Sequence, residues 1–192
     1  GANARPFTTH HNTLDIDLKL RISNELYLKR LIVGGLDRVY EMGHMFRNEG
    51  MDRNHNPEFT SMELYQAYGN MEDMIDITEN LIATMAKEVL GTMVIEYQGK
   101  TFDLTPPWKR MTMQDAVKEW VGVDFDLIQT DEEARAIAKK HDLEDWDKLS
   151  RGNVIAELFE EYCEQHLDGP IFITGHPVEI SPLAKRNAIH PE

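Results

Sequence analysis

Apolar positions follow helical spacing in some stretches of the 192-residue chain and alternate with polar ones in others. The clearest helical stripe is in residues 70–89, where apolar side chains recur every three or four positions and Gly91 follows as a stop signal. Ser23 and Thr112 occupy positions typical of helix N-caps. Four further stretches have helical patterning: residues 24–33, 112–120, 131–141 and 152–167.

Strand patterning is strongest in residues 39–49 and 59–68, which flank a polar loop. A short hairpin is predicted in residues 92–104, turning at Gln98-Gly99. Two short strands are expected at residues 170–175 and 177–180. Helices mixed with antiparallel hairpins predict an α+β domain, in which a sheet carries helices on one side.

If residues 39–49 and 59–68 pair, alternation puts charged and aromatic side chains on one face of the pair. That face would carry Val39, Glu41, Gly43, Met45, Arg47, Glu49, Phe59, Ser61, Glu63, Tyr65 and Ala67. The opposite face would carry Tyr40, Met42, Phe46, Met62 and Leu64, a pattern that predicts core.

The polar face has the chemistry of a binding site. The guanidinium group of Arg47 can hold a carboxylate or phosphate through two parallel hydrogen bonds. Phe59 offers a flat apolar surface for a base, and Glu63 with the Tyr65 hydroxyl could hold an ammonium group. The alternative is a solvent-facing surface in which Glu49 neutralises Arg47.

Composition narrows the possible functions. The net charge of −14 argues against a surface that wraps nucleic acid by itself. No apolar run is long enough to cross a membrane. Cys163 is the single cysteine, which suits a reducing compartment, and its helical context predicts a small buried side chain. The adjacent His10 and His11 would point in opposite directions on an extended segment, so we expect no metal site in residues 1–192.

The segment "FRNEGMDRNHNPEFTSMELYQAY" resembles the second signature motif of class II aminoacyl-tRNA synthetases, and among them the lysyl members. The matching positions are Arg47, Glu49, His55 and Phe59. "GANARPFTTHHNTLDIDLKLRISNELYLKRLIVGGLDRVYEMG" and "FITGHPVEISPLAKRN" also look like this family, and the resemblance is weakest at residues 92–150. It implies the antiparallel sheet of the class II catalytic domain with flanking helices.

The resemblance also implies roles for individual residues. Arg47 would bridge the amino-acid carboxylate and the α-phosphate of ATP and act in catalysis. The ATP site would comprise Arg47, Glu49, His55, Asn56 and Phe59. The lysine site would comprise Gly1, Glu25, Arg47, Glu63 and Tyr65. The reaction would join lysine to ATP as lysyl-adenylate, releasing pyrophosphate, and then transfer the lysyl group to tRNA(Lys).

Several family features are absent from this sequence: the first and third signature motifs, the region with the Mg²⁺-binding carboxylates, and the anticodon-binding domain. We therefore expect residues 1–192 to be a partial catalytic domain, truncated at both ends and inactive alone. The complete enzyme would be a cytoplasmic homodimer that uses lysine, ATP, Mg²⁺ and tRNA(Lys), without a membrane partner.

Two other functions stay open. One is a related ligase that attaches a lysine derivative to a translation factor. The sequence "MELYQAY" favours the synthetase over this ligase. A non-catalytic relative could bind lysine or a partner protein, and lysine binding independent of ATP would identify it.

Overall fold

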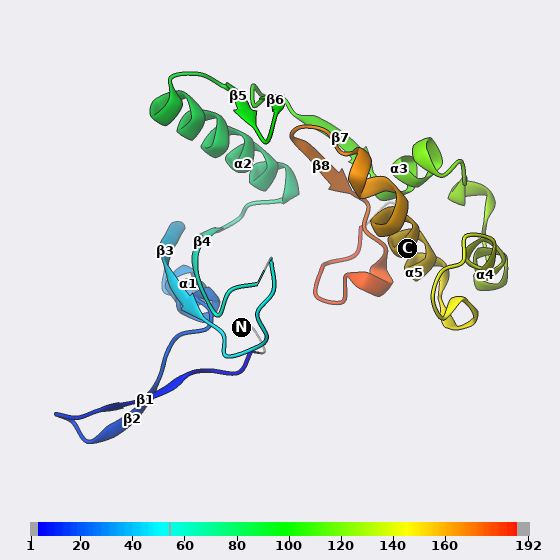
Figure 1. Ribbon diagram of the computed structural model, residues 1–192. Helices are drawn as coiled ribbons and strands as arrows, with labels where there is room; N and C mark the ends of the chain where they lie inside the picture. The colour runs from blue at the N-terminus through cyan, green and yellow to red at the C-terminus, as the bar shows by residue number, and fades with distance from the viewer. Residues whose placement is uncertain (1–3, 54, 188–192) are drawn as a thin grey trace. The chain divides into compact units, whose positions relative to one another are not determined.

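The computed structural model describes residues 4–53 and 55–187 and divides the chain into two compact units, Gly1–Glu72 and Asp73–Glu192 (Figure 1). Both units mix helices with short strands, and this confirms the predicted α+β class. The strands form four separate pairs, three antiparallel and one parallel, in the described part of the chain. In that part, no helix is long and apolar enough to cross a membrane.

The first unit begins with a hairpin, where the sequence analysis expected only an extended segment at His10 and His11. Strands β1 (Thr8–His11) and β2 (Ile16–Lys19) pair antiparallel, with His10 opposite Asp17. The imidazole of His10 contacts the carboxylates of Asp17 and Asp15, at 2.9 and 3.2 Å. These contacts give His10 a structural role.

Helix α1 (Glu25–Val33) matches the predicted helix, and its N-cap is Asn24 rather than Ser23. The Ser23 hydroxyl still accepts a hydrogen bond from the backbone N–H of Glu25 at 3.2 Å. The helix packs against both strands of the next hairpin and buries Leu28.

Strands β3 (Arg38–Phe46) and β4 (Glu58–Gln66) pair antiparallel over their whole length. The register aligns Glu41 with Glu63 and Met45 with Phe59, so the predicted polar set does share one face. The predicted core face is wrong: Tyr40 is 74% exposed and Met42 is 67% exposed, whereas Met45 on the polar face is 1% exposed. The reason is that α1 packs on the face that carries Tyr65, with Lys29 over its ring.

Helix α2 (Met71–Met85) begins two residues before the second unit and lies mostly within it. The helix continues as a π-helical turn, Ala86–Leu90, and ends at Gly91 in the left-handed conformation. The predicted apolar stripe is only partly buried, because Met71, Met85 and Val89 are exposed. Glu79 is buried instead and accepts a hydrogen bond from the backbone of Trp108 at 2.9 Å.

Strands β5 (Val94–Tyr97) and β6 (Lys100–Asp103) form the predicted hairpin around Gln98 and Gly99, which both have positive φ. Strand β7 (Lys109–Thr112) pairs in parallel with β8 (Ile171–Thr174). The sequence analysis predicted β8 within residues 170–175 but missed β7 and the parallel pairing. The predicted strand at residues 177–180 is a short 3-10 turn, Val178–Ile180, because the chain leaves β8 at Gly175, which has positive φ.

Between β7 and β8 lies a helical segment with α3 (Met113–Trp120), α4 (Asp131–Lys140) and α5 (Arg151–Leu158). Helix α5 continues through a π-helical turn, Phe159–Cys163, and a 3-10 turn, Glu164–His166. Two short 3-10 turns, Phe125–Leu127 and Trp146–Lys148, connect the helices. Side chains at 0–1% exposure form the centre of its core: Ala116, Val117, Phe125, Ala134, Ala138, Val154, Ile155, Leu158 and Cys163.

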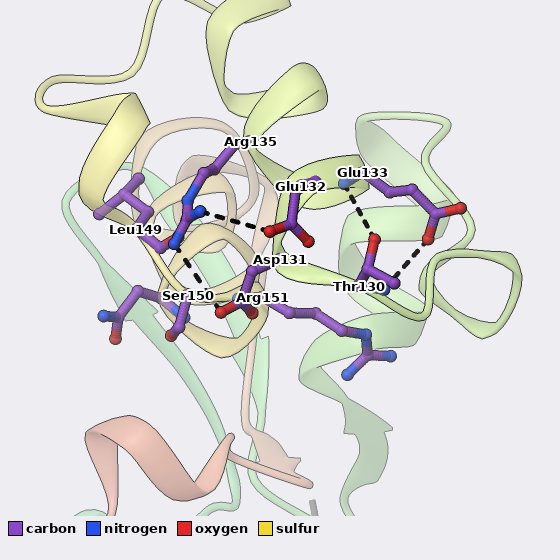
Figure 2. A network of polar contacts seen from close by, with 9 residues as sticks. Thr130, Asp131, Glu132, Glu133, Arg135, Leu149, Ser150 and Arg151 are labelled. Carbon is purple, nitrogen blue, oxygen red and sulfur yellow. Dashed lines mark hydrogen bonds and ion pairs between the residues drawn. The ribbon is translucent and has the colours of Figure 1, made fainter.

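Polar contacts fix the helix starts in this segment. Thr112 accepts from the backbone of Asp115 at 3.0 Å, as predicted. Thr130 and Glu133 form a reciprocal capping box at the start of α4 (Figure 2). Arg135 donates to the carbonyl oxygen of Leu149 and lies near Asp131 and Glu132, which ties α4 to the start of α5 (Figure 2).

Candidate functional site

The candidate site is the face of the β3–β4 pair that carries the polar set, called here the site face. Its members on the two strands are Val39, Glu41, Gly43, Met45, Phe59, Ser61, Glu63 and Tyr65. Period-two alternation put these side chains on one face, and the nine-residue register of the two strands keeps them there.

The connector between β2 and α1, residues 20–24, runs beside β3 and completes the site face. The backbone N–H of Phe46 donates to the carbonyl oxygen of Arg21 at 2.8 Å. The Nε of Arg47 lies 3.5 Å from the carbonyl oxygen of Ile22. The connector therefore brings Arg21, Ile22 and Ser23 to the site face, and our sequence analysis assigned none of them to the site.

Arg47 follows the last residue of β3 and is half-buried. Its backbone N–H donates to the carbonyl oxygen of Pro57 at 2.8 Å, which closes the loop between the strands. Its guanidinium carbon lies 5.2 Å from the centre of the Phe59 ring, within the range of a cation–π contact. The cation and the flat aromatic surface are therefore adjacent.

The alternative arrangement, in which Glu49 neutralises Arg47, does not occur. Within residues 4–53 and 55–187 no ion pair joins these two side chains; only their backbones are hydrogen-bonded, at 3.0 Å. Glu49 is exposed. The guanidinium group of Arg47 can thus receive an anionic ligand without first displacing a carboxylate.

Glu63 and Tyr65 form the second part of the site. The Tyr65 hydroxyl donates to Oε2 of Glu63 at 3.0 Å, and the Ser23 hydroxyl lies 3.5 Å from Oε1. Burial, together with the hydrogen bond to Glu63, raises the pKa of Tyr65 to about 12. Tyr65 is therefore a neutral donor at physiological pH, and Glu63 is held between two hydroxyl groups.

Glu25 opens α1 and forms an ion pair with Lys29 one turn later, at 2.5 Å. The hydrogen bond from Lys29 lowers the pKa of the Glu25 carboxyl group. Lys29 also lies 5.9 Å from the centre of the Tyr65 ring. Glu25, Lys29 and Tyr65 therefore belong to one polar cluster.

The loop between β3 and β4 carries the other predicted ATP-site residues. His55 is held within the loop: its backbone N–H and its Nδ1 both lie 2.9 Å from the Asp52 carboxylate. Asn56 is exposed. In the described part of the chain, no hydrogen bond, ion pair or ring contact joins the side chains of Glu49, His55 or Asn56 to Arg47 or Phe59. Gly1, predicted near the lysine α-amino group, lies outside the described residues.

A ligand that fits the site face would carry three features: an anionic group for Arg47, a flat ring for Phe59, and a cationic group for Glu63 and Tyr65. Comparison with known protein families identifies the class of protein to which a chain with this site belongs. The family model for class II tRNA synthetases (D, K and N) matches residues 1–192. The chain therefore belongs to that family, which confirms the resemblance seen in its motifs.

Three curated relatives of this chain are lysine–tRNA ligases. A lysine–tRNA ligase of Thermoanaerobacter pseudethanolicus is 61% identical over 191 residues, covering 100% of this chain and 38% of the relative. Lysine–tRNA ligases of Clostridium botulinum (strain Loch Maree) and Clostridium acetobutylicum are 58% and 56% identical, covering 97% and 100% of this chain. The chain thus spans 38% of the length of these relatives.

Proposed function

We propose that this chain forms part of a site that activates lysine with ATP and transfers the lysyl group to tRNA(Lys). The observation that carries the proposal is the arrangement of the site face: Arg47 lies on Phe59, and the Glu63–Tyr65 pair lies on the same face. The identity of 56–61% to lysine–tRNA ligases supports lysine as the amino acid.

In this proposal Arg47 holds the lysine carboxylate and the α-phosphate of ATP together. Bringing two anions to one guanidinium group orients the attacking carboxylate toward phosphorus. The same group stabilises negative charge that grows on the phosphate oxygens in the transition state. Phe59 would carry the adenine ring, with Glu49 and Asn56 also lining the ATP site, and His55 would reach the outer phosphates after leaving Asp52.

The Glu63 carboxylate and the Tyr65 hydroxyl would bind the side-chain ammonium group of lysine, and Glu25 and Gly1 would bind near the α-amino group. A carboxylate satisfies an ammonium ion through charge-assisted hydrogen bonds, and the neutral Tyr65 keeps that carboxylate oriented. A side chain without a cation would leave Glu63 desolvated and unpaired, which is the basis of selectivity.

Mg²⁺ is expected with ATP in this family, and the described residues do not fit it. No group of three or more histidine, cysteine, aspartate or glutamate side chains in residues 4–53 and 55–187 is arranged to hold a metal ion. We further propose that the complete protein works as a homodimer in the cytoplasm. The free, buried Cys163 supports the cytoplasmic location, because free thiols suit a reducing compartment.

The test is amino-acid-dependent ATP–pyrophosphate exchange by the full-length protein with each of the twenty amino acids. We expect exchange with lysine alone, followed by lysine transfer to tRNA(Lys). Exchange with a β-lysine-type analogue in preference to lysine would instead identify the translation-factor ligase. Lysine binding without any exchange would identify a binding module.

A further inference from the structure

Glu41 and Glu63 lie on the site face and Glu25 lies beside it at the start of α1; two of these three glutamates already have a cation. Glu25 is paired with Lys29, and Glu41 is paired with Arg21. Glu63 has only the hydroxyl groups of Tyr65 and Ser23 as described partners, and both are neutral. Of the three carboxylates, Glu63 is thus the one whose described contacts leave its charge uncompensated.

This distribution matters because Glu41 and Glu63 face each other directly across the two strands. Opposed side chains on one face of an antiparallel pair have Cβ atoms about 4.5–5.5 Å apart, and like charges there repel. Without a cation at Glu41, an incoming ammonium group would meet two competing carboxylates. The Arg21–Glu41 ion pair leaves a single uncompensated carboxylate opposite it.

Arg21 reaches Glu41 by lying across the backbone of β3 at Gly43. Its Nε donates to the carbonyl oxygen of His44 at 2.9 Å, while Nη1 contacts Glu41. A Cβ atom at Gly43 would lie 2.0 Å from Nη2 of Arg21 and 3.2 Å from its Cζ. Any side chain at position 43 would therefore displace the guanidinium group.

We propose that Arg21 is a positioning residue for ammonium recognition: it lies on Gly43 and neutralises Glu41, so that the lysine side chain is directed to Glu63. The inference rests on the proposed function, because it takes the ligand to be a primary ammonium ion. It assigns Arg21 and Gly43 a part in amino-acid selection, although neither needs to touch the substrate.

The experiment measures KM for lysine and for ATP by pyrophosphate exchange in the full-length protein, for Arg21→Ala, Glu41→Gln and the double variant. Each single change leaves an unbalanced charge beside Glu63: an extra carboxylate in Arg21→Ala, an extra guanidinium in Glu41→Gln. We expect each to lower kcat/KM for lysine about tenfold, the size of coupling between charges in contact. KM for ATP should stay within about twofold, since the Arg47–Phe59 contact is untouched.

The double variant removes both charges and should restore kcat/KM for lysine to within about threefold of wild type. A general loss of packing cannot produce this rescue. If the double variant is no better than the worse single variant, or if lysine and ATP suffer equally, the proposal is wrong.

Gly43→Ala tests the same idea without changing any charge. The added methyl group should displace Arg21 and reproduce the lysine defect of Arg21→Ala, with no further loss when both substitutions are combined. Arg38→Ala is the matched control, because Arg38 is an exposed arginine on the opposite face of β3. Normal lysine kinetics in Gly43→Ala would contradict the proposal, as would a tenfold defect in the control.

The failure of this inference is distinguishable from the failure of the proposed function. A wild-type protein that shows no lysine-dependent exchange removes the proposed function. A wild-type protein that exchanges with lysine, together with an Arg21→Ala variant whose lysine KM is normal, removes only the role of Arg21.

Discussion

The two units of the chain hold their structure by different means. In the second unit, apolar side chains from α3, α4 and α5 form a core in which several residues are at 0% exposure. In the first unit, Leu28 and Met45 are the described apolar side chains that are fully buried, whereas Tyr40 and Met42 are exposed. The first unit instead orders its polar side chains through hydrogen bonds and ion pairs on the site face.

The difference indicates that the two units have different roles. Close packing resists change and suits a segment whose role is to be rigid. Charged groups on a half-buried polar face stay hydrated until a ligand displaces the water, and this suits a binding site. Substitutions in the second unit should therefore cost stability, and substitutions on the site face should cost ligand binding or catalysis.

The largest effect is expected from Phe125→Ala in the core of the second unit. Phe125 is 1% exposed, and its truncation should lower the free energy of unfolding by about 3–5 kcal/mol. Alkylation of Cys163, followed by peptide mass spectrometry under increasing denaturant, measures the loss, because burial raises the pKa of this thiol to about 11 and protects it until the unit opens. Tyr97→Ala, at a 62% exposed side chain, is the control and should change little.

Arg47→Ala should lower the rate of lysine activation and leave the stability of the second unit unchanged. Loss of one oriented charge donor should slow lysine activation about 10²-fold or more, with unchanged protection of Cys163. Pre-steady-state formation of the adenylate in the full-length protein measures the effect. Arg47→Lys keeps the charge but loses the planar fork, so it should recover only part of the rate. Near-normal activation in Arg47→Ala would remove Arg47 from its proposed role.

Glu79→Ala tests whether a polar residue can also stabilise the second unit, because Glu79 is a buried carboxylate within that packed unit. The substitution removes the acceptor for the Trp108 backbone N–H and the carboxylate that lies 3.4 Å from Arg110. We expect a loss of about 1–3 kcal/mol in the free energy of unfolding, measured by denaturant titration. Glu79→Gln can still accept from Trp108 and should lose less; equal losses would mean that the ion pair dominates.

The smallest effect is a pH dependence of the free energy of unfolding, which arises from Tyr65 on the site face. The pKa of Tyr65 is raised from 10.0 to about 12 in the folded protein. The folded state thus holds this proton more tightly than the unfolded chain, so the stabilisation is complete below pH 10 and is lost as pH rises toward 12. Unfolding free energies of wild type and Tyr65→Phe should converge across this range, and a constant difference would contradict the assignment.

Local patterns in the sequence predicted much of this structure. Alternation predicted which residues share the site face, Thr112 was correctly placed as a cap, and the Gln98-Gly99 turn was found because its residues tolerate positive φ. Each of these features depends on side chains within a few positions of one another.

Features that depend on distant partners were missed. Strand β7 pairs with β8, which follows three helices later, and short strands carry no local sign of a parallel partner. The apolar face of β3 and β4 was assigned to the core because patterning alone cannot say which face α1 covers. The contact of Arg21 with Gly43 and Glu41 likewise joins residues about twenty positions apart.

The parallel β7–β8 pair also makes the helical segment an integral part of the second unit. Because Lys109 lies beside Ile171 and Thr112 beside Thr174, the chain leaves β7 at one end of the pair and enters β8 at the opposite end (Figure 1). Parallel strands need a crossover connection of about a dozen residues or more, and residues 113–170 supply it here. Met111, Ile171 and Ile173 also pack in the core that the helices form, so an exchange of residues 113–170 would remove the apolar surface against which both strands pack.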